Sequence, residues 1–278
     1  MRRFLFLLTP LWIITGCSVS AVPQHGFTVS SVSTLDAELG ETSGLFCRDD
    51  MAFTINDSGN KPEVFVINRN GETTGRVEVS ATNRDWETIT GDAENLFIGD
   101  IGNNAGKRSA LNIYRVAAER SDVEQTISIS YANNRPAQNQ PYAHDFDGEA
   151  MTYRDGDLII FSKSWETGRS HVYHISPDID KQVLTPAVSV DNLPGVVTGA
   201  DWSEQYQEFV LVGYRSNAFG LFKAFIATLD ANYQVKTVDL LPEFTQVEGV
   251  CYAKDGEVWI TQESTPYSSA KIAVLEFR

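Results

Sequence analysis

The sequence predicts an all-β fold, a five-bladed β-propeller, on the basis of three observations. A turn with an acidic or hydroxyl residue opens a burst of apolar residues five times along the chain. Successive openings are 44, 62, 52 and 47 residues apart, close to the period of about 40–50 residues expected for a propeller blade. The last repeat has room for three strands only, and a β-rich segment near the other end can supply its fourth. The openings begin at Ser43, Glu87, Glu149, Asp201 and Glu248.

Each repeat divides into short apolar runs separated by turn residues, which is the pattern of antiparallel strands. In the first repeat the turns are 48–50, 57–60 and 69–71, and their Asp-rich and Asn-Gly sequences are hairpin signals. The strands expected for the first four blades, in chain order, are 43–47, 51–56, 63–68 and 75–81, then 86–90, 96–100, 111–116 and 125–131, then 149–153, 158–162, 171–175 and 182–190, and finally 200–203, 209–213, 222–229 and 234–241.

The fifth blade takes strands 247–252, 258–261 and 271–277 and then reaches the end of the chain. Segment 27–35 is rich in β-branched residues, which favour strands. We expect it to pair with 271–277 and close the ring, because closure removes the exposed edges of an open sheet. Segment 133–147, rich in Asn, Pro and Gln, is expected to be a loop. A β-sandwich needs no fivefold motif, and a parallel β-helix has shorter repeats.

The first residues have the layout of a lipoprotein signal peptide. Arg2 and Arg3 precede an apolar run, 4–14, that is too short to span a bilayer. The run leads into Ile14-Thr15-Gly16-Cys17, which has the form of a bacterial lipobox. We therefore expect a signal peptide (1–16), a tether lipidated at Cys17 (17–26) and a propeller domain (27–278). The alternative is an ordinary secretory signal with a chance cysteine.

Several acyl chains on the cysteine would give lasting membrane attachment. Ser18, rather than Asp, follows the cysteine. In a Gram-negative bacterium this pattern predicts a protein of the cell envelope, anchored in the outer membrane. The sequence does not indicate which leaflet carries it.

The chain is acidic, with a formal net charge of −15. Removal of the signal peptide with its two arginines makes the mature part −17. No run of Lys and Arg appears, so we expect no nucleic-acid partner. An acidic surface suits cation binding, and equally a simple solvated exterior.

The repeat openings resemble the SdiA-regulated family of bacterial five-bladed propellers over the chain from about residue 27 to its end. That resemblance implies a calcium-type metal on the propeller axis and no settled biochemical activity. A weaker similarity to propellers called esterase-like phytases, through Asp85-Trp86-Glu87 and 57–60, would imply phosphoesterase chemistry, but no clear phosphate-clamping set of Arg and Lys is present. The matching openings are Thr42-Ser43-Gly44-Leu45, Asp85-Trp86-Glu87-Thr88-Ile89, Gly148-Glu149-Ala150-Met151, Thr198-Gly199-Ala200-Asp201-Trp202 and Val247-Glu248-Gly249-Val250.

Superposition of the five openings predicts a ring of side chains around the axis. Its four acids are Glu87, Glu149, Glu248 and Asp201, and they would repel one another if all were ionised and unpaired. A hard cation such as calcium, which takes about six to eight oxygen ligands, resolves this repulsion. Asp201 is shorter and would act through water. The alternative is that these acids accept backbone hydrogen bonds and fasten neighbouring blades.

A second ring is predicted where the second strand of each blade ends. Adjacent strands run antiparallel, so these ends lie on the face where the first strands begin. This places Asp57, Asp100, Lys163 and Arg215 near any metal. The set would bind a polar or anionic small molecule; a salt-bridged rim is the alternative.

Cys47 and Cys251 lie on the first strands of the first and fifth blades, which the closed ring makes neighbours. Their positions differ by one residue in the aligned repeats, which reverses the face, and two adjacent blades meet with opposite faces. Both thiols therefore point into one interface. A disulfide that staples the ring closure and a pair of buried free thiols are equally compatible with the sequence.

Together these features predict a calcium-binding propeller of the cell envelope. It would act as a binding or scaffold module for a small polar molecule or an envelope protein. The alternative is a metal-dependent hydrolase of phosphoesters or lactones, with Glu87 or Glu149 as base and Lys163 as an electrostatic clamp. Fold alone does not choose between them.

Overall fold

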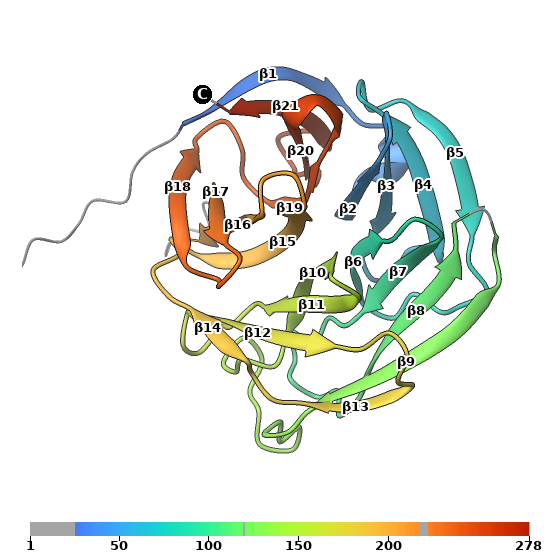
Figure 1. Cartoon of the computed structure of the whole chain (residues 1–278), viewed down its shortest axis with the longest axis vertical. Coiled ribbons are helices and arrows are strands. Elements are labelled where there is room, and N and C mark those ends of the chain that lie inside the picture. The colour runs from blue at the N-terminus through green and yellow to red at the C-terminus, as the bar shows by residue number, and fades with distance from the viewer. Residues whose placement is uncertain (1–25, 119, 217–221, 278) are drawn as a thin grey trace, which may run out of the picture.

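The computed structural model describes residues 26–118, 120–216 and 222–277, which form five small sheets around a common centre (Figure 1). The prediction of a five-bladed β-propeller is confirmed. The lipobox, with Cys17, lies outside the described residues. Within them, no helix is long and apolar enough to cross a bilayer. Helical structure there consists of two single-turn 3-10 helices, η1 (Ala37–Leu39) and η2 (Lys254–Gly256).

Blades one, two and four follow the expected order, with the first strand of each at the centre and later strands further out. Blade one consists of β2 (Thr42–Arg48), β3 (Met51–Asn56), β4 (Glu63–Asn68) and β5 (Thr73–Glu78). Blade two begins with β6 (Trp86–Gly91), β7 (Asn95–Asp100), β8 (Leu111–Ala117) and β9 (Val123–Tyr131). Blade four consists of β15 (Val196–Ser203), β16 (Glu208–Ser216), β17 (Phe222–Asp230) and β18 (Val235–Leu241).

The ring is closed by the N-terminal strand, as predicted. Blade five contains β19 (Val247–Tyr252), β20 (Glu257–Gln262) and β21 (Lys271–Phe277), and β1 (Phe27–Thr34) adds the outermost strand. β1 runs antiparallel to β21, with Phe27 opposite Phe277, and Figure 1 shows the two ends of the fold side by side. Strands from the beginning and the end of the fold thus lie in one sheet. Their pairing closes the ring through backbone hydrogen bonds.

The outer strand of blade three differs from the expectation. The inner strands are β10 (Gly148–Arg154), β11 (Asp157–Ser162) and β12 (Ser170–Ile175), but segment 182–190 is divided into β13 (Lys181–Leu184) and β14 (Val188–Val190). β14 pairs with β12, whereas β13 crosses to blade two and pairs in parallel with β9. Pro186 lies between them. A proline has no N–H to donate to a ladder, so a continuous strand is interrupted there.

The hydrophobic core consists of five clusters, each between two neighbouring blades. The cluster between blades one and five surrounds Cys251 and includes Trp259 and Ile272. In the same interface Cys47 and Cys251 form a disulfide, with Cα atoms 5.5 Å apart and a sequence separation of 204 residues. The bridge joins the innermost strands of the first and last blades, so it fastens the seam of the ring.

Candidate functional site

Each innermost strand carries a β-bulge near its start. In every case the register with the second strand of the blade shifts by one residue. A bulge leaves one residue unpaired and re-aims its side chain, and such bulges are frequent beside functional sites. The residues skipped by the register are Gly44, Glu87, Glu149, Thr198 and Glu248. The ring that they define therefore has three carboxylates.

Ser43 and Asp201 occupy other positions than expected. Ser43 precedes the bulge, and its Oγ donates a hydrogen bond to the carbonyl oxygen of Glu87 at 2.7 Å. Asp201 lies three residues beyond the bulge of β15. Its carboxylate accepts hydrogen bonds from Thr152 Oγ1 at 3.1 Å and from Tyr252 N at 2.8 Å. Both residues thus fasten neighbouring blades, which is the alternative role that the sequence leaves open for the acids.

A pocket of about 440 Å³ opens at the end of the channel where the bulges lie. Most of the residues that line it carry a carboxylate or an aromatic ring. The acids are Asp57, Glu87, Glu149, Glu248 and Glu263, the aromatic residues are Tyr142, Trp165, Tyr214 and Phe222, and the cation is Lys163. The ends of second strands and the starts of first strands do share one face, because Asp57 and Lys163 line the same pocket as the bulge residues.

Asp100 and Arg215 do not line this pocket. Asp100 is buried and pairs with Arg108 at 2.7 Å, and Arg108 also donates to the carbonyl oxygens of Asp100 and Gly102. Arg215 is exposed. It follows Tyr214 on β16, and successive side chains of a strand point to opposite faces. Because Tyr214 lines the pocket, Arg215 is directed away from it.

Lys163 is the positive centre of the pocket. Its Nζ donates to Glu149 Oε2 at 3.0 Å, and the two side chains are only 7% and 2% exposed. Nζ also lies 5.2 Å from the ring centre of Trp165 and 5.4 Å from that of Tyr214. Burial lowers the pKa of Lys163, but Glu149 and the other nearby acidic groups outweigh it and hold the pKa well above its ordinary value. The side chain therefore stays an ammonium.

Three carboxylates form a compact group beside this pair. Asp57, Asp85 and Glu87 each offer one oxygen, and these oxygens lie within 4.8 Å of one another. Burial and then the charge of Asp57 raise the pKa of Asp85 to about 6. Burial and then the charge of Glu149 raise the pKa of Glu87 well above its usual range. The group thus combines negative charge with poor solvation.

Two features of the residues around this group fit a bound cation. Glu149 Oε1 is buried and makes no hydrogen bond among the described residues. Gly102 packs its backbone against the acids, so that a Cβ there would overlap Glu87 Oε1 and lie 2.6 Å from Asp85 Oδ2. Oxygen-rich, carboxylate-lined sites suit calcium and similar hard cations. The donor set, the unpaired oxygen and the close approach of a glycine all agree with such an ion.

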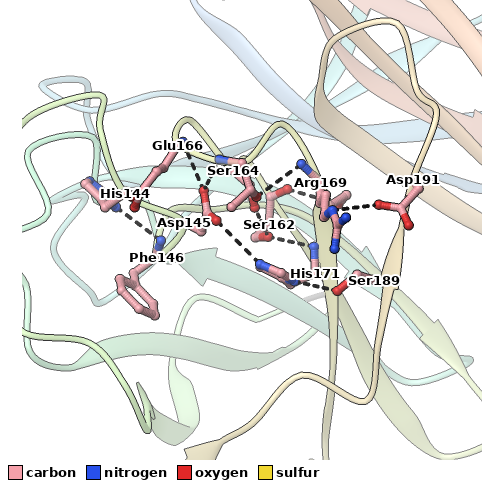
Figure 2. A network of polar contacts seen from close by, with 12 residues as sticks. His144, Asp145, Phe146, Ser162, Ser164, Glu166, Arg169, His171, Ser189 and Asp191 are labelled. Atoms are coloured by element: carbon pink, nitrogen blue, oxygen red, sulfur yellow. Dashed lines mark hydrogen bonds and ion pairs between the residues drawn. The ribbon is translucent and has the colours of Figure 1, made fainter.

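A polar network supports the loop between β11 and β12, and Figure 2 shows Asp145 beside Ser164 and Glu166 of that loop. Asp145 Oδ1 accepts hydrogen bonds from the backbone of Glu166 at 3.0 Å and of Thr167 at 3.1 Å. Asp147, from the same segment, accepts one from Trp165 Nε1 at 2.8 Å. Segment 133–147 is thus a loop, as predicted, except for an isolated bridge, and it fixes one wall of the pocket.

The same network places a serine, a histidine and an aspartate in line. His171 Nδ1 lies 2.7 Å from Ser189 Oγ, and His171 Nε2 lies 3.5 Å from Asp145 Oδ2 (Figure 2). In serine hydrolases Nε2 faces the serine and Nδ1 the aspartate. The order here is the reverse, and Ser189 is simply opposite His171 across β12 and β14. We therefore assign this network a supporting role.

The same pocket is also lined by Glu248 and Glu263. Burial raises the pKa of Glu248 to about 7, Lys163 opposes this, and Asp57 reinforces it. Burial and then Glu248 raise the pKa of Glu263 to about 9. Gln246 Nε2 donates to Glu263 Oε2 at 3.3 Å. No ion pair involves either glutamate in the described part of the chain.

Sequence reasoning missed Asp85 and most of the aromatic wall, namely Tyr142, Trp165 and Phe222, as site residues. A signal for Asp85 was present, because Asp85 precedes Glu87 by two residues just as Asp147 precedes Glu149. Gln246 stands in the same relation to Glu248 and also lines the pocket. The repeat that encodes the site is therefore an acid or amide followed, two residues later, by a glutamate.

No protein-family model matches the chain, and no curated protein matches its sequence. Among solved structures, a luciferin-regenerating enzyme is similar over 88% of this chain and 95% of its own, at 11% identity and a TM-score of 0.47. A proposed oxidoreductase (glucose dehydrogenase) from Thermus thermophilus is similar over 90% of this chain and 100% of its own, at 11% identity and a TM-score of 0.48. Both similarities concern the backbone fold alone.

Proposed function

We propose that this chain is a cell-envelope lipoprotein whose propeller binds a calcium-type cation at the axial pocket and serves as a binding module. The observation that supports this most is the group formed by Asp57, Asp85 and Glu87. Its members Asp57 and Glu87 line a pocket of ligand size. Calcium prefers such carboxylate oxygens. The proposed lipoprotein identity depends on the lipobox at Cys17, and the resemblance of the five openings to the SdiA-regulated propellers agrees with the metal.

Asp57, Asp85 and Glu87 would hold the cation, with Glu149 Oε1 as a further donor. A bound ion would offset the mutual repulsion of the acids and rigidify the pocket wall. Lys163 already neutralises Glu149 through Oε2, so Lys163 and the ion would divide the negative charge of the pocket between them. A small polar molecule or a segment of an envelope protein would enter beside them.

Metal analysis and thermal unfolding test the cation. Purified protein is expected to contain calcium in equimolar amount and to melt at a lower temperature after chelation, because an ion that binds the folded state alone stabilises it. Absence of bound metal, with no response of the melting temperature to added calcium, would contradict the cation site. The acids would then only stabilise the contacts between neighbouring blades. For the anchor, a Cys17→Ser variant is expected to leave the membrane fraction, whereas wild type stays in it.

A metal-dependent hydrolase of phosphoesters or lactones is the second candidate. The observation that favours it is a buried acid, Glu248, whose pKa is raised to about 7 at the edge of an open pocket. Such values suit general acid–base chemistry near neutral pH. Turnover that needs metal and disappears in Glu149→Gln would support an enzyme. Failure of a broad phosphoester and lactone screen would support the binding module.

A further inference from the structure

Acidic groups outnumber cationic groups in the pocket, even with a divalent cation in place. Five carboxylates and one ammonium line it, and Asp85 adds a sixth carboxylate behind them. A divalent ion would be shared by Asp57, Asp85 and Glu87, while Lys163 is committed to Glu149. Glu248 and Glu263 make no ion pair among the described residues, and Lys163, which lowers the pKa of both, forms its ion pair with Glu149.

Aromatic rings surround the same space. Trp165 and Tyr142 meet edge to face with ring centres 5.2 Å apart, and Tyr214 and Phe222 do the same at 5.0 Å. The hydrogen bond from Trp165 Nε1 to Asp147 fixes the indole ring. Aromatic faces attract cations within about 6 Å of the ring centre. Lys163 Nζ already occupies this kind of position over both Trp165 and Tyr214, so these rings accept a positive charge.

Charge and aromatic lining together select among ligand classes. An anion such as a phosphate would meet the excess of carboxylates and be repelled. A neutral polyol would gain hydrogen bonds but no Coulomb attraction. An organic cation would lower the pKa values of Glu248 and Glu263, which burial raises, and so favour their ionised forms. It would then gain both the attraction of these carboxylates and contact with the aromatic faces. The net charge of the whole chain, −15, also steers cations toward the protein.

We propose that the organic ligand of this pocket is a small amine, bound through its ammonium group between Glu248, Glu263 and the aromatic wall. The inference rests on the proposed function as a binding module and names the ligand class of that site. The ammonium does not replace the divalent ion, since different carboxylates would hold the two, Glu248 and Glu263 the ammonium and the group of three acids the ion.

Calorimetry on the full chain in detergent tests this, with choline and 1,4-diaminobutane as probes, in buffer saturated with calcium and again after chelation. Glucose and inorganic phosphate are the neutral and anionic comparisons. We expect both amines to bind more tightly than glucose or phosphate. Glu263→Gln is expected to weaken amine binding about fivefold. Glu78→Gln, which removes the same charge from an exposed site on the outermost strand of blade one, is expected to leave it unchanged.

Equal affinity of wild type and Glu263→Gln for both amines would overturn the inference, as would binding of glucose or phosphate without binding of amines. Failure of the amines while calcium binds normally would overturn the inference and leave the proposed cation site intact. Amine binding in a chain that takes up no calcium would support the inference and count against the cation site.

Discussion

Lys163 Nζ donates to Glu149 Oε2 at 3.0 Å, deep in the axial pocket, while the other oxygen of Glu149 has no hydrogen-bond partner among the described residues. Both residues come from blade three, one from the bulge of β10 and one from just beyond β11. The pair therefore neutralises one acid of the ring and leaves the neighbouring acids in need of another cation.

Removal of one partner of this buried pair is expected to destabilise the fold. Lys163→Met leaves Glu149 buried without its cation, which costs about 3 kcal/mol in proteins of this kind. The double change Lys163→Met, Glu149→Gln removes both charges and is expected to recover most of that loss. Urea unfolding in the presence of chelator measures the three variants against wild type. A double variant as unstable as Lys163→Met alone would show that the pair is not the cause.

Gly102→Ala is expected to impair cation binding while the fold persists. The new Cβ would overlap Glu87 Oε1 and crowd Asp85, so these carboxylates must move away from the positions that they share. We expect calcium affinity to fall about tenfold or more, as for other changes beside metal ligands. Gly75→Ala is the matched control, because its Cβ would meet only Val66, at an ordinary 3.4 Å. Equal calcium affinity in both variants would contradict the assignment of these acids.

The disulfide between Cys47 and Cys251 is expected to form in the purified protein and to stabilise it. Alkylation in denaturant without reductant should leave the mass unchanged, and modification of both thiols would show that no bridge exists. The bridge spans a sequence separation of 204 residues, so its loss should cost about 2–4 kcal/mol. Denaturant unfolding of Cys47→Ser, Cys251→Ser against wild type measures this cost.

Asp201 is expected to make stability depend on pH between about 4 and 6. Burial raises its pKa in the folded chain to about 6 from 3.8. The folded state thus holds the proton more tightly than the unfolded state, and this contribution to stability is full below the unfolded pKa and is lost as the pH rises through 6. Relative to wild type, Asp201→Asn should gain up to about 3 kcal/mol between pH 4 and pH 7. A difference in stability that is constant with pH would contradict this.

The blades and their closure were predictable because each depends on patterns that the sequence states directly. Alternating apolar runs and Asn-Gly or Asp-rich turns give the strands, and the three-stranded last repeat requires an N-terminal partner. The shared face of Asp57 and Lys163 with the bulge residues followed from antiparallel pairing alone. The split at Pro186 had a signal too, since a proline does not suit a continuous strand that is paired on both sides.

The exact members of the axial ring were not predictable in the same way. A bulge inserts one residue without changing the apolar pattern, so alignment of the openings placed Ser43 and Asp201 where Gly44 and Thr198 lie. The positive φ of Gly44, 65°, is a consequence of that bulge and has no counterpart in residue spacing. Trp165 reaches the pocket from the loop beyond β11, where repeat alignment has nothing to superpose.

Calorimetric titration of calcium into chelator-treated protein tests the central claim most directly, because it asks whether Asp57, Asp85 and Glu87 hold a divalent ion. We expect equimolar binding in wild type and in Asp122→Asn, which neutralises an exposed acid outside the pocket. We expect affinity about tenfold or more lower in Asp85→Asn, since one of three clustered carboxylates is lost. Binding of the same strength in Asp85→Asn and wild type, or no binding in wild type, would contradict the account.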